Sequence, residues 1–285
     1  MTYRELYEYG RLALEAAGVA ESALDARLLL EYICRADRNE LLVHGDCERS
    51  SMEEQFYRTV IEKRAARVPL QHIVGEQEFM GLRFKVNEHT LIPRQDTEIL
   101  VEEAMHHLSD GMRILDLCTG SGCILLSLLQ YSNECEGVGI DISDKALMIA
   151  RENAKRLGLE AAFLEGDLFA PLADFVSDKT TDRLFDMIVS NPPYIETAVI
   201  GTLMPEVREH EPVLALDGGE DGLYFYRKIV AEAPNHMRKG AHLFFEIGCE
   251  QGDAVMSLMR EAGLMQVEIS KDYAGLDRVV SGVKG

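Results

Sequence analysis

Apolar residues in the first part of the chain recur every three or four positions, which is the spacing of one face of a helix. The pattern predicts helices over residues 6–17, 24–32 and 51–66, packed as a small helical domain over residues 1–68. This segment has no glycine-rich phosphate loop and no catalytic cluster. We expect the domain to recognise a partner; the alternative is that it only supports the remainder of the chain.

The next segment changes to the alternating pattern of β-strands. Pro69 ends the preceding helix, and the alternation that follows reverses at Gly81, where a turn is expected. This predicts a β-hairpin linker over residues 69–92. A helix should follow, with Asp96 or Thr97 as its N-cap.

From about residue 112, short apolar strands alternate with helices. Strands are expected near 113–117, 137–141, 161–165, 185–190, 242–247, 266–270 and 278–283. This alternation is typical of an α/β fold with a mostly parallel sheet and helices on both faces, here in a domain over residues 93–285. Because the loop between the last two strands is too short for a crossover helix, the final strand should run antiparallel.

Composition adds limits on location and on metal binding. The chain has 285 residues, of which 47% are hydrophobic, but no run approaches the roughly 20 apolar residues that a membrane span needs. The N-terminus lacks the apolar stretch of a signal peptide. We therefore expect a cytoplasmic protein that does not bind membranes. The six cysteines lack metal-ligand spacing, which predicts reduced thiols and no metal site.

The charge balance bears on the kind of partner. The chain carries 49 acidic and 29 basic residues, for a net charge of -20. Proteins that bind nucleic acid neutralise phosphates with Lys and Arg, so stable nucleic-acid binding is not expected. An acidic chain attracts a basic protein partner, although the same charge can serve solubility alone.

The loop after the first strand of the predicted sheet runs from Asp116 to Gly122. Gly120 and Gly122 let the backbone turn tightly beside a ligand. The loop lacks the third glycine of a dinucleotide fingerprint and the lysine of a phosphate-binding loop. It resembles instead the D/E-x-G-x-G-x-G loop of Rossmann-like methyltransferases, which implies S-adenosylmethionine as cofactor. Cys118 replaces the first glycine, a departure that is tolerable if Cys118 keeps an ordinary φ.

Acidic residues after the next two strands are candidate cofactor ligands. Asp141 ends the second strand, where a carboxylate can accept hydrogen bonds from both hydroxyls of a ribose. The alternative for Asp141 is a helix cap or a surface position. After the third strand, Asp167 is a candidate for binding an adenine amino group and Leu168 for packing on the ring, although an Asp in a loop is often only solvated.

The fourth strand is followed by Asn-Pro-Pro-Tyr at 191–194. Prolines have no N–H donor, so the nearby carbonyls can accept from a ligand. The carbonyls of Asn191 and Pro192 together suit a planar NH2 group, and would stabilise the charge that develops on its nitrogen during methyl transfer. The Tyr194 ring could stabilise the same charge. The motif therefore predicts methyl transfer to an amino or amide nitrogen, with Asn191, Pro192 and Tyr194 as catalytic residues.

Further motifs extend this similarity along nearly the whole chain. The motif at 191–194 resembles that of amino-methyltransferases, which include adenine-N6 DNA enzymes and glutamine-N5 protein enzymes. The full set of motifs resembles the HemK/PrmC family. These motifs are residues 92–98, 116–122, 191–194, 217–223, 246–248 with Gln251, and 271–272 with Gly275 and 277–278.

The resemblance implies a Rossmann-like S-adenosylmethionine methyltransferase that methylates the glutamine amide nitrogen (N5) in the Gly-Gly-Gln motif of peptide chain release factors. It implies a cofactor site lined by Cys118, Thr119, Gly120, Ser121, Gly122, Asp141, Leu168 and Asn191. It also implies that Asn191, Pro192, Pro193 and Tyr194 hold the substrate glutamine.

Other substrates remain open at this point. A glutamine in a ribosomal protein is one alternative, because the related ribosomal-protein enzymes share most of these motifs. Adenine in nucleic acid is another, although the chain shows no basic target-recognition region. A binding module that kept the fold but lost the chemistry is disfavoured by the intact residues 191–194.

Overall fold

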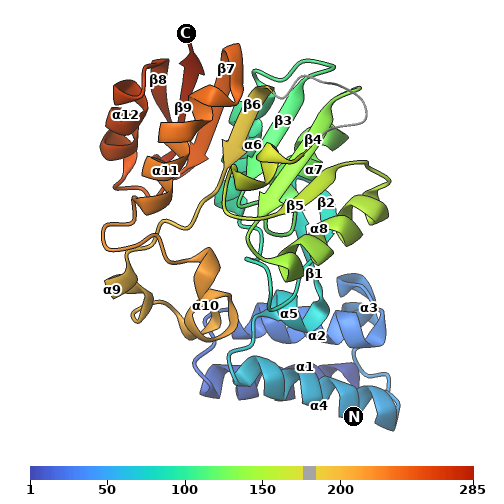
Figure 1. Cartoon of the computed structure of the whole chain (residues 1–285). Helices are drawn as coiled ribbons and strands as arrows, with labels where there is room; N and C mark the ends of the chain where they lie inside the picture. The colour runs from blue at the N-terminus through green and yellow to red at the C-terminus, as the bar shows by residue number, and fades with distance from the viewer. Residues whose placement is uncertain (176–183) are drawn as a thin grey trace. The chain divides into compact units, whose positions relative to one another are not determined.

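The computed structural model describes residues 1–175 and 184–285. It divides the chain into two compact units, which we call the helical unit and the sheet unit (Figure 1). The helical unit contains Met1–Glu76 and Met204–His210, and the sheet unit contains Gln77–Leu203 and Glu211–Gly285. Within the described residues, no helix has the length and apolar character that crossing a membrane requires.

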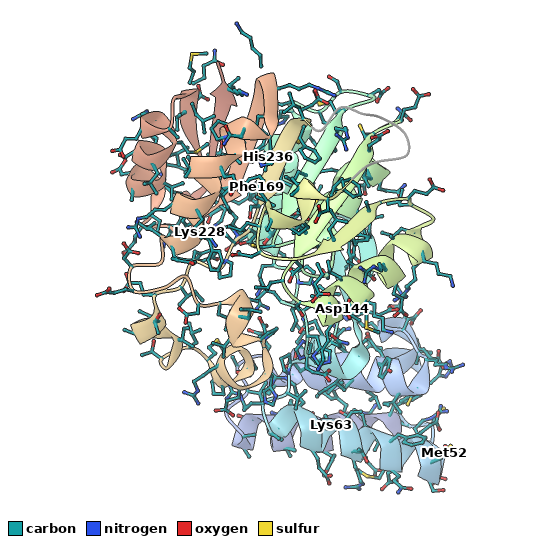
Figure 2. All side chains as sticks on the ribbon, in the orientation of Figure 1. Met52, Lys63, Asp144, Phe169, Lys228 and His236 are labelled. Atoms are coloured by element: carbon teal, nitrogen blue, oxygen red, sulfur yellow. The ribbon has the colours of Figure 1, made fainter. Side chains whose placement is uncertain are left out.

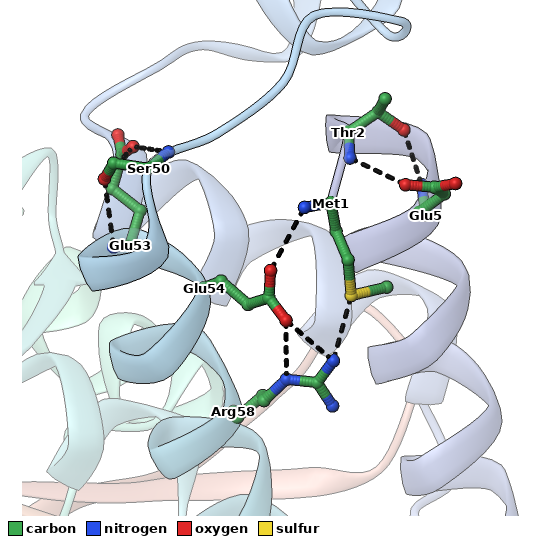
Figure 3. Close-up of polar contacts among 7 residues, drawn as sticks. All are labelled: Met1, Thr2, Glu5, Ser50, Glu53, Glu54 and Arg58. Atoms are coloured by element: carbon green, nitrogen blue, oxygen red, sulfur yellow. Dashed lines mark hydrogen bonds and ion pairs between the residues drawn. The ribbon is translucent and has the colours of Figure 1, made fainter.

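The helical unit contains the helices α1 (Tyr3–Ala16), α2 (Ser22–Cys34), α3 (Arg38–Val43), α4 (Ser51–Ala65), α5 (Leu70–Val74) and α10 (Pro205–His210). Of these helices, α1, α3 and α4 begin with a side-chain cap and α2 and α5 do not. Helices α1 and α4 each start with a capping box, made by Thr2 with Glu5 and by Ser50 with Glu53 (Figure 3). The amino group of Met1 binds Glu54 at 3.0 Å, which ties the start of α1 to α4 (Figure 3).

A cluster of ion pairs between buried and half-buried side chains joins α10 to the other helices of this unit. Arg64 Nε lies 2.7 Å from Asp25 Oδ2, and Arg64 Nη2 lies 2.9 Å from Glu206 Oε1. Arg67 Nη2 lies 2.6 Å from Glu206 Oε2. Because Glu206 is on α10, these contacts hold the stretch 204–210 with the N-terminal helices.

The main sheet has the topology that the strand pattern predicts. Its strands are β3 (Arg113–Leu117), β4 (Glu136–Asp141), β5 (Ala162–Glu165), β6 (Phe185–Ser190), β7 (Met237–Glu246), β8 (Leu264–Lys271) and β9 (Asp277–Lys284). Among the described residues the order is β5-β4-β3-β6-β7-β9-β8. The strands from β5 to β7 pair in parallel, and β9 runs antiparallel to both its neighbours. The predicted mostly parallel sheet with an antiparallel final strand is confirmed.

Helices cover both faces of this sheet (Figure 1). The elements between the strands are α6 (Gln95–Met105), α7 (Cys123–Gln130), α8 (Asp144–Leu157), η1 (Ala170–Ala173), α9 (Thr197–Ile200), η2 (Val213–Ala215), α11 (Tyr224–Glu232), η3 (Ala233–Asn235) and α12 (Gly252–Glu261). Ile114 packs with α6 and α7 on one face, and the next residue, Leu115, packs with α11 and α12 on the other. On the second face Phe169 stacks on His236 with ring centroids 4.6 Å apart (Figure 2).

The segment before the main sheet differs in detail from the prediction. Helix α6 begins at Gln95 without a side-chain cap, so the prediction that Asp96 or Thr97 caps it is wrong. Both side chains have distant partners instead: Asp96 binds Arg278 at 3.1 Å, and Thr97 contacts Asn191 at 3.3 Å. The predicted hairpin consists of β1 (Glu76–Phe79) and β2 (Leu82–Lys85), and the short helix α5 precedes it.

Candidate active site

A cleft opens in the sheet unit at the carboxyl ends of β3, β4, β5 and β6, with about 1040 Å³ of empty space, its open mouth included. In open α/β sheets, ligands bind at this edge, where the strand order reverses. Of the residues predicted from sequence, the cleft is lined by Cys118, Thr119, Gly120, Ser121, Asp141, Asp167, Leu168, Asn191 and Pro193. Gly122, Pro192 and Tyr194 are not part of the lining that the described residues form. Among all residues that the structure describes, no three or more His, Cys, Asp or Glu side chains form a cluster that could hold a metal ion.

The loop after β3 turns by means of left-handed backbone. Cys118 has φ 60°, Gly120 has φ 55° and Gly122 has φ 79°. The condition under which Cys118 could replace the glycine, an ordinary φ, is therefore not met: the chain leaves the strand so sharply that even a residue with a Cβ adopts this conformation, at a cost of about 1–2 kcal/mol. Gly122 has a packing role, since a Cβ there would lie 3.2 Å from the Ala150 Cβ on α8.

The buried carboxyl group of Asp116 holds this loop through a hydrogen bond. Asp116 is completely buried in β3, and the Thr119 hydroxyl donates to its Oδ2 at 2.6 Å. Burial raises the pKa of Asp116 to about 7, and the bond from Thr119 opposes that rise. The acidic residue at the start of the motif thus orders the loop from inside the protein.

Asp141 is one of two carboxylates from the described residues that line the cleft, and it is held by the backbone. Its Oδ2 accepts from the Gly120 N–H and its Oδ1 accepts from the Ser143 N–H, both at 2.9 Å. Burial raises the pKa of Asp141, and these backbone bonds oppose the rise. Each oxygen has a second lone pair, so the carboxylate is held in place and can still accept from two hydroxyls in the cleft.

Asp167 and Leu168 form the wall that follows β5. Leu168 is buried and has φ 50°. The Asp167 carboxylate accepts from Nζ of Lys228 at 2.6 Å, and Lys228 lies on α11 (Figure 2). Asp167 lines the cleft and already has a protein partner, so a ligand amino group would share its oxygens with Lys228.

The Asn-Pro-Pro-Tyr segment leaves β6 at the same edge. Ser190 anchors the strand end by donating to the Leu117 carbonyl at 2.7 Å. Asn191 Nδ2 donates to Thr97 Oγ1 at 3.3 Å. Within the described residues the Asn191 side-chain oxygen accepts no hydrogen bond, so it can accept from a ligand. At the other end, the Tyr194 hydroxyl donates to Glu246 Oε1 at 3.4 Å. Both ends of the motif are held by side chains from other elements.

The glycine-rich motif at 217–223 packs directly on this segment. A Cβ on Gly218 would lie 2.7 Å from the Tyr194 Cα, and a Cβ on Gly222 would lie 2.4 Å from the Tyr194 carbonyl oxygen. Gln251 Nε2 donates to that same oxygen at 3.0 Å. These distances explain why glycines stand at 218 and 222: the backbone approaches too closely for any side chain.

The rest of the cleft wall was not predicted from the sequence to bind a ligand. It includes His89, Leu91, Pro93, Thr97, Pro212, Leu214 and Phe225. Most of these residues are apolar and have no spacing typical of a ligand site. The available signal was their position within or beside the motifs at 92–98 and 217–223.

Two family models match the chain. The model described as the PrmC N-terminal domain matches residues 5–75, and the one described as a methyltransferase domain matches residues 108–242. The first range falls in the helical unit and the second contains the strands that form the cleft.

Curated relatives are similar over almost their whole length. The release factor glutamine methyltransferase of Geobacter sulfurreducens is 41% identical over 281 residues, which cover 99% of this chain and 96% of the relative. That of Caulobacter vibrioides is 43% identical, covering 95% and 92%. A crystal structure of a methyltransferase from Pyrococcus furiosus shares the fold at 17% identity, with a TM-score of 0.54 over 79% of this chain and 99% of that one. The chain belongs to the family of release factor glutamine methyltransferases.

Proposed function

We propose that this protein transfers a methyl group from S-adenosylmethionine to the side-chain amide nitrogen of the glutamine in the Gly-Gly-Gln motif of peptide chain release factors. The observation that carries the proposal is the Asn191 amide at the edge of the cleft: its NH2 group donates to Thr97, and its oxygen accepts no hydrogen bond from the residues that the structure describes. Two relatives that cover nearly the whole chain bear the name of this activity.

The residues of the cleft fit the proposed cofactor. The fixed Asp141 carboxylate can accept from both ribose hydroxyls, Leu168 offers an apolar surface for the adenine, and Asp167 can accept from its amino group. The loop at 118–121 would border the amino acid end. When bound, the cofactor supplies a methyl group on a positively charged sulfur.

The task of the protein is to present a poor nucleophile. An amide nitrogen has its lone pair delocalised into the carbonyl, so it must be oriented and its developing charge stabilised. In the proposed geometry, the Asn191 side-chain oxygen and the Pro192 carbonyl accept from the two amide N–H bonds. The Tyr194 ring would face the same group. The bound cofactor would supply the methyl group and keep the electrons of its carbon–sulfur bond, while the amide nitrogen, held by Asn191 and Pro192, would form the new bond to carbon and give one proton to solvent.

We assign choice of the protein partner to the helical unit. Met52 and Phe56 lie one turn apart on α4, and they are 64% and 55% exposed (Figure 2 labels Met52). Exposed apolar side chains of this kind are suited to contact with another protein. The net charge of -20 is unfavourable for nucleic acid, and we infer a cytoplasmic location because the proposed substrate acts on the ribosome.

The test of this function is the Asn191→Ala variant. With an intact recombinant release factor as substrate, methyl transfer should fall by about 100-fold or more, because one of the two acceptors for the amide is lost. Binding of S-adenosylmethionine, measured by calorimetry, should largely survive. Asn133→Ala is the matched control, since Asn133 is exposed and its side chain bonds only Asp110 among the described residues. Full activity of Asn191→Ala would reject the mechanism.

A further inference from the structure

A side chain that has no part in the mechanism above joins three of the sequence motifs. Gln251 lies immediately before α12 and is half-buried. Its Oε1 accepts from the Gly248 N–H at 3.0 Å. Its Nε2 donates to the Tyr194 carbonyl at 3.0 Å and to the Gly222 carbonyl at 3.3 Å. One amide group therefore fastens the glycine-containing motifs after β7 and before α11 to the Asn-Pro-Pro-Tyr segment.

These three hydrogen bonds use both ends of the Gln251 amide and fix the direction in which it points. A primary amide carries two N–H donors on its nitrogen and an acceptor on its oxygen. The Gly248 N–H can only donate, so it requires the amide oxygen. The two carbonyls can only accept, so they require the amide nitrogen. The position thus needs a side chain that accepts once and donates twice, and glutamine supplies this set.

The backbone around the Gln251 amide is packed closely. A Cβ on Gly222 would lie 2.5 Å from Gln251 Nε2, and a Cβ on Gly248 would lie 3.0 Å from Gln251 Oε1. Glycine at both positions lets the two backbone segments approach the amide. The amide is therefore enclosed by the same backbone groups to which it is hydrogen-bonded, and it cannot turn without breaking these bonds.

The bond to Tyr194 acts on the last residue of the Asn-Pro-Pro-Tyr segment. The peptide group between Tyr194 and Ile195 is bonded at both of its polar atoms: its oxygen accepts from Gln251, and its N–H donates to the Leu216 carbonyl at 3.0 Å. Because a peptide group is planar, two bonds on opposite sides fix its orientation. They fix with it the direction in which the Tyr194 Cα carries the aromatic ring.

We propose that Gln251 is a positioning residue for methyl transfer, which holds the Tyr194 end of the Asn-Pro-Pro-Tyr segment in the place that the substrate amide requires. This inference rests on the proposed function, because Tyr194 faces the substrate glutamine only in that account. Gln251 is absent from the cleft lining that the described residues form. It therefore acts through the backbone of Tyr194 and touches neither cofactor nor substrate.

The size of the effect follows from the sensitivity of rate to position. A misplacement of about 1 Å in a reacting arrangement costs about 100-fold in rate. Without Gln251 the Tyr194 peptide group keeps the bond on its nitrogen and loses the bond on its oxygen. We therefore expect a partial displacement, which lowers kcat by about 10-fold. The cofactor site should be little affected, because Gln251 does not line it.

The experiment uses the full-length enzyme, S-adenosylmethionine and an intact recombinant release factor. Gln251→Met keeps the length of the side chain and removes its hydrogen bonds. Gln251→Glu keeps the shape and the acceptor for the Gly248 N–H, but its carboxylate sets a negative charge against two carbonyl oxygens. We expect kcat to fall about 10-fold in Gln251→Met and about 100-fold in Gln251→Glu, with the dissociation constant of S-adenosylmethionine changed by less than about threefold.

The order of the two variants is a readout that packing alone would not produce, because Glu matches the shape of Gln more closely than Met does. Gln130→Glu is the matched control, since Gln130 is exposed at the end of α7. It should leave kcat and cofactor affinity within about twofold of wild type. Wild-type kcat in Gln251→Met, a smaller loss in Gln251→Glu than in Gln251→Met, or a loss of cofactor affinity as large as the loss of kcat would each overturn the proposal.

Hydrogen exchange decides the matter if Gln251→Glu does not fold. The Ile195 N–H should exchange faster in Gln251→Met than in wild type, because its peptide group has lost the bond on the oxygen side. Equal exchange in the two proteins would contradict the proposal. Absence of methylation by the wild-type enzyme would instead reject the proposed function.

Discussion

The role of Asp141 leads to a prediction whose size follows from the structure. The carboxylate already accepts two backbone N–H bonds, from Gly120 and Ser143, and would accept two ribose hydroxyls as well. A hydrogen bond to a charged group contributes about 1.5–3 kcal/mol. Removing two of them in Asp141→Ala should therefore cost at least about 3 kcal/mol of binding, which is about 100-fold in the dissociation constant.

Calorimetric titration with S-adenosylmethionine measures this constant directly. Asp144→Ala is the matched control, because Asp144 begins α8 but is exposed, and its carboxylate pairs only with Arg151, at 3.4 Å, among the described residues (Figure 2 labels Asp144). The control should bind within about twofold of wild type. Turnover of Asp141→Ala at saturating cofactor should recover most of its rate. A dissociation constant for Asp141→Ala within twofold of wild type would refute the ribose role.

Three further changes test the surrounding structure. Cys118→Gly should be tolerated or stabilise the fold by up to about 1 kcal/mol in thermal denaturation, whereas Cys118→Val should destabilise it, because a β-branched residue resists left-handed φ; equal stability of the two would contradict this. Gly218→Ala should lower kcat and melting temperature because its Cβ meets backbone at 2.7 Å, whereas Gly201→Ala, with open space around it, should be neutral in the same assays. Replacing Met52 and Phe56 together by serine should raise KM for the release factor at least about threefold and leave cofactor affinity unchanged; an unchanged KM would count against partner recognition by α4.

The elements of the fold and the edge that carries the site were predictable because both leave local signals. Buried parallel strands are mostly apolar runs. The stretch from Asp116 to Gly122 begins at the end of one such strand, and the residues at 191–194 follow another directly. Since the carboxyl ends of neighbouring parallel strands share one edge, the two motifs had to meet. The antiparallel final strand followed from loop length alone.

The contacts that hold the site were not predictable from the same signals. Thr97 looked like a helix cap because its type and place fit one, yet it bonds a residue 94 positions away. The left-handed conformation of Cys118 depends on how sharply the chain must leave β3. The ion pairs of Glu206 depend on Arg64 and Arg67, which are more than a hundred residues earlier in the chain. Such pairings depend on tertiary packing, which residue spacing does not record.

The most direct test of the central claim is peptide mapping by mass spectrometry of a release factor incubated with this protein and S-adenosylmethionine. The account predicts a gain of one methyl group, about 14 Da, on the glutamine of Gly-Gly-Gln, and no gain in a reaction with the Asn191→Ala variant. An unmodified glutamine, in a reaction where the enzyme is folded and binds the cofactor, would contradict it.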